Sequence, residues 1–342
     1  MLSKQEFIQI PKVEFHRHLD GSIRFETLVD LIQHNKIPMK YSGEELYEKA
    51  KVLTPMKDLQ TVLDSFWISQ KALCNYEAIK RVSFENVEDA FYDGIKLIEL
   101  RFASTFIAQG KNLKNDEIIE GVIDGISEGM KKYPIQVGLI HILPRSLPTN
   151  ENIEAHKTIL KYQKSHHKDA DRIVGFDLAD SENENDQSYL DQILEAKNSH
   201  LGITIHSGEN TNHSCVMNSI KNLHAQRIGH GLKIWKHEEA IQLVKERNIH
   251  LELCPTSNWL TNSVKSLKDH PFHALYKAGV SVSLNSDDPH LMGIDLINEY
   301  KVIHDLFGWG MGDFYEMNKK ALDHSFLNAE LKDYIRKNHF LN

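Results

Sequence analysis

The sequence has no apolar run that approaches the roughly 20 residues needed by a membrane-spanning helix. Residues 1–11 also lack the apolar segment of a signal peptide. The only three cysteines are Cys74, Cys215 and Cys254, and their wide spacing gives neither a disulfide framework nor a paired-cysteine metal site. These absences lead us to expect a cytoplasmic protein that has no membrane partner.

An excess of positive charge is missing as well. The chain has 40 Lys and Arg residues against 48 Asp and Glu, so its formal net charge is -8 and it offers nucleic acid no general attraction. No internal repeat, low-complexity tract or linker rich in proline and glycine divides the 342 residues, of which 41% are hydrophobic and 26% are charged. We therefore expect one globular domain over residues 1–342, without a nucleic-acid partner.

Short β-rich runs alternate with longer amphipathic segments along the chain. Eight runs are predicted to be strands: Lys12–His18, Ile95–Phe102, Ile135–Leu143, Arg172–Leu178, Gly202–His206, Arg227–His230, His250–Cys254 and Val280–Asn285. Between them, Asn115–Lys132, Asp186–Lys197 and His237–Arg247 are predicted to be helices. No strand is followed by the GxGxxG sequence of a dinucleotide-binding fold. The alternation predicts an α/β protein, a (β/α)8 TIM barrel, and the alternative is a generic α/β fold with a miscounted strand.

The connection between the first two predicted strands is unusually long. It runs from Gly21 to Gly94, which is far longer than a simple loop between a strand and a helix, and we expect it to be a helical insertion. Within it, an apolar stripe falls at helical spacing and is formed by Leu59, Val62, Leu63 and Phe66. The residues alone favour a helix that packs on the barrel, and the alternative is a lid that excludes water from a site.

Polar residues gather at the carboxyl ends of the predicted strands, where TIM barrels place their active residues. These residues are His16, His18, Asp177, Asp180, His206, His230, Asp287 and Asp288. His16 and His18 lie two positions apart in one strand, so both imidazoles face the same side. Three histidines and one carboxylate suit zinc with an open position for water, whose pKa the metal lowers to about 7. Each residue alone also fits a structural role, but their joint occurrence at strand ends favours a metal site.

Two further residues near these strand ends carry possible chemistry. Glu209 follows His206 by three positions, and a carboxyl group beside a metal site can act as a proton donor, although a solvated loop carboxylate is the alternative. His230 lies between Gly229 and Gly231, which permit close approach to a ligand. The residues leave open whether His230 binds the metal or orients the attacking water.

Five segments carry a resemblance to a known family: Lys12–Ser22, His206–Glu209, Arg227–Gly231, Cys254–Asn258 and Ser286–Pro289. They read KVEFHRHLDGS, HSGE, RIGHG, CPTSN and SDDP, and they span residues 12–289 in the order of the family. Each segment is weakly specific, but together they resemble the adenosine deaminases, which are metal-dependent hydrolases on a (β/α)8 barrel. The resemblance therefore covers nearly the whole chain.

The resemblance implies one Zn2+ per chain with four ligands: His16, His18, His206 and Asp287. Glu209 corresponds to the acid that protonates purine N1, His230 to the residue that orients and helps deprotonate the water, and Asp288 to the carboxylate that engages N7 and the hydroxide. Asp20 corresponds to the residue that binds the ribose 5′-hydroxyl. The stripe formed by Leu59, Val62, Leu63 and Phe66 resembles the family's apolar gate over the nucleoside, and this resemblance favours the lid over simple packing.

The reaction implied by the resemblance is hydrolytic deamination of a small-molecule purine nucleoside in purine salvage. Adenosine or 2′-deoxyadenosine would give inosine or 2′-deoxyinosine and ammonia. The alternatives are a deaminase of adenine or of a 5′-modified adenosine, a catalytically inactive binding relative, and an unrelated barrel hydrolase of the phosphotriesterase kind. Asp20 favours a nucleoside. The phosphotriesterase alternative is disfavoured, because the end of the fourth predicted strand has no lysine. The sequence does not indicate an oligomeric state.

The chain departs from the family pattern at two positions. After the fourth strand the family typically reads Asp-Leu-Ala-Gly-Asp-Glu, with the glycine amide at purine N3, whereas this chain has Asp180 in place of the glycine. Ala103 stands where relatives often carry serine. We expect Asp180 to be a substrate-binding residue that alters recognition of the purine or the sugar.

Overall fold

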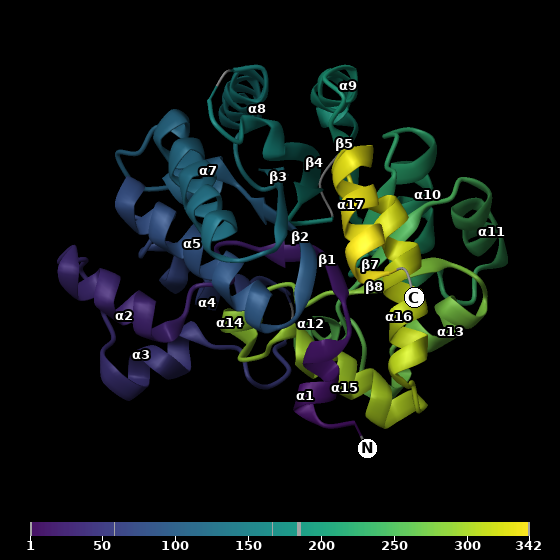
Figure 1. Ribbon diagram of the computed structural model, residues 1–342. Coiled ribbons are helices and arrows are strands. Elements are labelled where there is room, and N and C mark those ends of the chain that lie inside the picture. Colours follow the sequence, from purple (N-terminus) through teal and green to yellow (C-terminus); the bar gives the residue numbers. More distant parts are fainter. Residues whose placement is uncertain (1, 58, 166, 183–185, 341–342) are drawn as a thin grey trace.

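The computed structural model describes residues 2–57, 59–165, 167–182 and 186–340. For residues 59–61 and 63–64 it describes the backbone but not the side chains. Its centre is an eight-stranded parallel sheet in the order β1 to β8, so each strand pairs with its neighbour in the sequence. Figure 1 shows the helices arranged around these strands. The predicted α/β fold, a (β/α)8 TIM barrel, is confirmed.

All eight predicted strands are present, and each observed end lies within one residue of its predicted position. The strands are β1 (Lys12–His18), β2 (Ile95–Phe102), β3 (Gln136–Pro144), β4 (Ile173–Ala179), β5 (Gly202–Ser207), β6 (Arg227–His230), β7 (His250–Leu253) and β8 (Ser281–Leu284). The segment after β8 meets β1, because His18 N–H donates to the Asp287 carbonyl (2.8 Å) and Asp287 N–H donates to that of His16 (2.9 Å). These bonds bring the first and last strands together and leave the barrel nearly closed.

The helices before, between and after the strands are α1 (Lys4–Gln9), α2 (Phe25–His34), α3 (Gly43–Ala50), α4 (Leu59–Gln70), α5 (Tyr76–Tyr92), α6 (Ser104–Ala108), α7 (Asn115–Lys132), α8 (Thr149–Gln163), α9 (Leu190–Asn198), α10 (His213–Lys221), α11 (Glu238–Glu246), α12 (Pro255–Leu260), α13 (Phe272–Lys277), α14 (Pro289–Met292), α15 (Leu296–Phe307), α16 (Met311–Ala321) and α17 (Ala329–His339). The helix predicted over residues 186–197 begins as a 3-10 turn, Asp186–Tyr189, a common start for an α-helix. No helix in the described part of the chain combines the length and apolarity needed to cross a membrane.

The insertion after β1 is helical, as predicted, and comprises α2 to α5. Helix α4 turns Val62 and Phe66 into an apolar cluster with Ala103, Phe106 and Met292, which follow β2 and β8. This cluster lies at the carboxyl ends of the strands, so α4 covers that end of the barrel. The side chains of Leu59 and Leu63 lie outside the described residues.

The interior of the barrel is charged, whereas TIM barrels usually fill this space with branched apolar side chains. Five fully buried charged residues from four strands meet there: Glu99, Arg101, Asp177, Arg227 and Glu252. The main apolar core lies instead between the sheet and the helices, where Ile98 of β2 belongs to one cluster with Val82 of α5 and Val122 of α7. Opposite charges inside the barrel therefore compensate one another beneath the carboxyl ends of the strands.

Candidate active site

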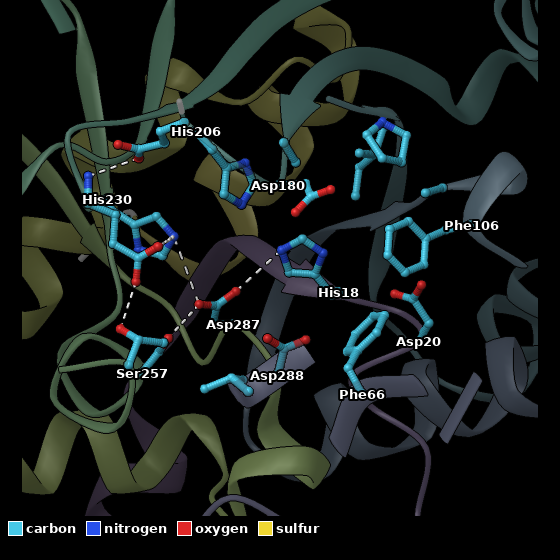
Figure 2. A pocket seen from close by; sticks show the side chains of 18 of the residues that line it. His18, Asp20, Phe66, Phe106, Asp180, His206, His230, Ser257, Asp287 and Asp288 are labelled. Atoms are coloured by element: carbon cyan, nitrogen blue, oxygen red, sulfur yellow. Dashed lines mark hydrogen bonds and ion pairs between the residues drawn. The ribbon is translucent and has the colours of Figure 1, made fainter. Parts of the chain in front are cut away.

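Side chains from four strand ends converge in the space predicted for a metal. Potential ligand atoms of His16, His18 and His206 all lie within 4.8 Å of one another, as do those of His16, His230 and Asp287. Asp287 Oδ1 is 3.3 Å from Nε2 of both His16 and His18. Figure 2 shows the carboxylate of Asp287 between His18 and His230. Three imidazoles and a carboxylate at these spacings form a donor set that suits zinc.

The hydrogen bonds around two of the histidines prepare them to bind a metal. His16 Nδ1 lies 2.9 Å from Glu252 Oε2, and His206 Nδ1 lies 3.1 Å from Asp177 Oδ1. A carboxylate that accepts a hydrogen bond from Nδ1–H leaves the Nε2 lone pair free for a metal. His16 Nε2 is buried and has no hydrogen-bond partner, a state that a metal ion would relieve. The residues present therefore fit the expected cofactor.

Arg101 joins the two carboxylates that orient these histidines. Its Nη1 donates to Asp177 (2.8 Å) and its Nη2 donates to Glu252 (2.7 Å). Burial raises the pKa of Asp177, but His206 and Arg101 outweigh this effect and hold that pKa well below its usual range. Sequence reasoning missed Arg101 and Glu252 and gave Asp177 no role. The available signal was a set of charged residues at inward positions of buried strands.

The pKa values of the adjacent Asp287 and Asp288 carboxyl groups are shifted in opposite directions. Burial raises the pKa of Asp287, but the neighbouring histidines reverse this and hold it well below its usual range. Burial and the charge of Asp287 raise the pKa of Asp288 well above its usual range. Gly21 makes room for Asp288, because a Cβ at Gly21 would lie 1.7 Å from Asp288 Oδ1. The two side chains are thus suited to different tasks.

Glu209 lies beside this cluster, and its carboxylate is held firmly. Oε1 accepts hydrogen bonds from Thr261 Oγ1 (2.8 Å), Asn258 Nδ2 (3.2 Å) and Ser263 Oγ (3.2 Å). Oε2 lies 3.7 Å from His230 Nε2. The side chain is therefore a buried, oriented carboxylate and not a solvated one.

The loop that carries Glu209 is fixed by Glu182, to which sequence reasoning gave no role. The Glu182 carboxylate accepts backbone hydrogen bonds from four consecutive residues: Gly208, Glu209, Asn210 and Thr211. Burial raises the pKa of Glu182, but these donors and the Thr211 hydroxyl outweigh it and lower the pKa. A charged acceptor of this kind sets the loop conformation and hence the position of Glu209.

Helix α12 supplies two further side chains that sequence reasoning did not assign. Ser257 Oγ donates to Asp287 Oδ2 (2.7 Å), and Asn258 Nδ2 donates to His230 Nδ1 (3.1 Å). With the amide in this orientation, His230 accepts at Nδ1 and carries its proton on Nε2, which faces Asp287 Oδ2 at 3.9 Å. A protonated Nε2 donates to a neighbouring oxygen and does not bind a metal.

One cavity unites most of the predicted site residues. Its lining includes His18, Asp20, Val62, Phe66, Asp180, His206, Glu209, His230, Asp287 and Asp288. His16 lies directly behind, with its ring centroid 4.5 Å from that of His206. In Figure 2, Asp20 and the rings of Phe66 and Phe106 lie on one side of His18, and His206, His230 and Ser257 lie on the other. The cavity thus has an apolar wall facing a polar one.

Asp180 lies on the cavity wall with its backbone at a positive φ of 74°, a conformation that favours glycine. Its carboxylate accepts hydrogen bonds from both the backbone N–H and the hydroxyl of Ser146. Arg145 Nη1 donates to the Asp180 carbonyl (3.3 Å). The carboxylate therefore has both space and a partner at the edge of the cavity.

The comparisons with known proteins agree with this geometry. The family described as "Adenosine deaminase" matches residues 11–338. The chain is 34% identical over 337 residues to an adenosine deaminase of Clostridium botulinum (strain Langeland), an alignment that covers 97% of this chain and 98% of the relative. The adenine deaminase from Arthrobacter aurescens superposes with a TM-score of 0.87 at 22% identity, covering 96% and 97%. The N6-methyl-AMP deaminase from Arabidopsis thaliana gives a TM-score of 0.83 at 25% identity, covering 98% and 97%.

Proposed function

The chain belongs to the adenosine deaminase family, and from that premise we propose that its preferred substrates are adenosine and 2′-deoxyadenosine. The reaction class, hydrolytic deamination of adenosine or a related adenine compound, follows from the family. The products would be inosine or 2′-deoxyinosine and ammonia. The choice of a nucleoside is the specific part of the proposal, and it rests on Asp20.

Asp20 has an unmet capacity to accept a hydrogen bond inside the cavity. Its Oδ2 accepts from Gln70 Nε2, but its buried Oδ1 has no partner. A sugar hydroxyl could donate to Oδ1, whereas free adenine has no sugar to do so. Burying an acceptor without a donor is unfavourable, so a nucleoside relieves a cost that adenine would leave in place.

The charge of the cavity argues against a 5′-nucleotide. No lysine or arginine is found among the described residues that line it, and the carboxylates of Asp20, Asp180 and Glu182 contribute to its wall. A phosphate dianion beside these groups would be repelled, and no lysine or arginine of the described lining compensates it. We therefore expect a phosphorylated substrate, of the kind named for the Arabidopsis relative, to react poorly here.

We propose that one zinc ion per chain is held by four residues: His16, His18, His206 and Asp287. Zinc, when bound, lowers the pKa of water to about 7 and so makes a nucleophile available at neutral pH. Glu209 then protonates purine N1, which makes C6 more electrophilic. His230 orients the attacking water by donating from Nε2. Asp288 would contact purine N7 and the attacking water, and α4 would cover the nucleoside with Val62 and Phe66.

A substrate panel tests the proposal directly. Metal-loaded protein would be assayed by ultraviolet absorbance with adenosine, 2′-deoxyadenosine, adenine, AMP and N6-methyl-AMP, and its zinc content would be quantified. We expect the two nucleosides to have the highest kcat/KM. Asp20→Asn should lower kcat/KM for adenosine by about tenfold, because it weakens the acceptor for the sugar. Higher kcat/KM for adenine or a nucleotide would contradict the choice of substrate, and no turnover of any compound would reject the deaminase.

The wider setting follows from the same proposal. We infer that the chain is a single domain over residues 1–342, that it acts in the cytoplasm, and that its reaction serves purine salvage. Fractionation of the source cells with an antibody against the protein would test the location. Growth on adenosine as a sole purine source, with and without the gene, would test the pathway.

A further inference from the structure

A second cavity lies at the opposite end of the barrel from the site described above. Its volume is about 790 Å3, and it is lined by residues at the amino ends of β5, β6 and β7 and by the segment before α17. These strands carry His206 and His230 at their carboxyl ends, so the two cavities lie at opposite ends of the same strands. The proposed deamination uses no residue of this second cavity.

The cavity is positively charged, although the whole chain has a net charge of -8. Besides the buried Arg227, its lysine and arginine residues are Lys197, Arg247 and Lys332. Asp323 is the one acidic residue of the described lining, and its carboxylate is paired with Arg336 at 2.6 Å. The lining therefore carries an excess of positive charge and would attract an anion.

The side chain of Arg227 lies buried at the base of this cavity. Its guanidinium is fully buried, with Nη1 2.6 Å from Glu99 Oε2 and Nε 2.8 Å from Glu252 Oε1. The rings of Phe15 and Phe326 lie 4.5 Å and 3.7 Å from its central carbon. Nη2 has no hydrogen-bond partner. The guanidinium is therefore enclosed by two carboxylates and two aromatic rings beneath the cavity.

The rim has cations that are free to reach a ligand. Lys197 and Arg247 are exposed, and among the described residues neither side chain has a hydrogen bond or an ion pair. Lys332 is held in place, because its Nζ donates to the Ser325 carbonyl at 3.2 Å. Guanidinium and ammonium groups together are the usual protein ligands of phosphate oxygens.

We propose that this cavity, which we call the amino-end cavity, binds a small phosphate-bearing anion. The phosphate would lie among Lys197, Arg247 and Lys332. Free phosphate and a phosphate ester offer the same group, so the source of the phosphate is a question for the experiment. The site is separate from the purine cavity and does not depend on which adenine compound reacts there.

Calorimetric titration at constant ionic strength tests the proposal. The metal-loaded protein would be titrated with inorganic phosphate and, separately, with ribose 5-phosphate, which lacks a purine. We expect saturable binding that the double variant Lys197→Gln, Arg247→Gln weakens by about tenfold, equivalent to about 1.4 kcal/mol. These side chains make no described contact, so the fold should be retained.

The matched control is the double variant Lys131→Gln, Lys277→Gln, which removes the same charge from exposed positions outside the cavity. It should bind phosphate as the wild type does. Tighter binding of ribose 5-phosphate than of phosphate would identify an ester as the ligand, and equal binding would identify free phosphate. Wild-type affinity in the first double variant, equal weakening in the control, or no saturable binding would each overturn the proposal. Because binding is measured without turnover, failure of the deaminase proposal would leave this result intact.

Discussion

Glu209 is the residue whose surroundings define its task most narrowly. Three donors fix Oε1, and the backbone on either side is held by Glu182. When it is protonated, a carboxyl group with so little freedom can deliver its proton to only one position. A role as a metal ligand is disfavoured, because Glu209 belongs to neither cluster of possible ligand atoms among the described residues.

Glu209→Gln should therefore retain zinc and lose the reaction. The amide keeps the size of the side chain but cannot supply a proton, and loss of a positioned acid typically costs about 100- to 10,000-fold in rate. The measurement is kcat with adenosine together with the zinc content of the purified variant. Thr261→Ala is the control, because it removes one hydrogen bond to Oε1 and leaves the carboxyl group. A normal rate in Glu209→Gln would remove Glu209 from the mechanism.

Asp180, like Ala103, lines the cavity and is expected to depart from the pattern of the family. A non-glycine residue at a φ of 74° is strained, and aspartate tolerates this conformation better than most residues. Asp180→Gly should restore the family backbone and remove the carboxylate that Ser146 holds. We expect a change in KM for adenosine with little loss of folding stability. Ser146→Ala keeps the Asp180 carboxylate but removes the hydroxyl that donates to it, so this variant should change KM in part. Equal kinetics of the wild type and Asp180→Gly would contradict a role of Asp180 in recognition.

At the scale of the strands, the candidate site depends on a network that crosses the interior of the barrel. Arg101 of β2 contacts Asp177 of β4 and Glu252 of β7, and these contact His206 of β5 and His16 of β1. One guanidinium thus holds the supports of two proposed zinc ligands that come from strands on different sides of the barrel. Both carboxylates and Arg101 are fully buried, so no solvent can replace a lost partner.

Arg101→Met tests this network. The apolar side chain leaves two buried carboxylates without their shared cation, and breaking a buried ion pair costs about 3–5 kcal/mol. We expect the free energy of unfolding to fall by about that amount, as measured by urea denaturation. The affinity for zinc, measured by competition with a chelator, should fall as well, because Glu252 and Asp177 are then free to reorient. Arg101→Lys should recover part of both, and unchanged zinc affinity in a folded Arg101→Met protein would show that the network is only structural.

The strands and the metal cluster were predictable because they depend on local pattern. Each strand is a short β-rich run, and His16 and His18 share one face through a spacing that any strand imposes. The supports were not predictable in the same way. Arg101 and Glu252 look like the polar positions of a half-exposed strand, and only the closure of the barrel shows that they face one another. Ser257 and Asn258 also gain their roles from tertiary contacts, since α12 brings them to Asp287 and His230.

At the scale of the whole molecule, buried and half-buried histidines give the fold a response to acid. Outside the proposed zinc ligands, burial strongly lowers the pKa of five histidines because it disfavours their charged form: His141 (about 3), His156 (about 4), His250, His270 (about 3) and His324 (about 4). In the unfolded chain their pKa is near 6.5, so unfolding takes up protons below that pH. Burial acts in the opposite direction on four carboxyl groups: it raises the pKa of Glu299 to about 7 and of Asp93 to about 6, and it also raises the pKa values of Asp20 and Asp288.

These shifts predict that the free energy of unfolding falls as the pH decreases below about 6.5. Each histidine contributes a loss of about 1.4 kcal/mol per pH unit until its folded pKa is reached, and the five histidines outnumber the four carboxyl groups that gain stability when protonated. Urea denaturation between about pH 7.5 and pH 4.5 measures the slope. His156→Leu isolates one group, because neither ring nitrogen of His156 has a hydrogen-bond partner. The variant should reduce the slope below pH 6.5 by about one proton, and a slope equal to that of the wild type would show that His156 does not titrate on unfolding.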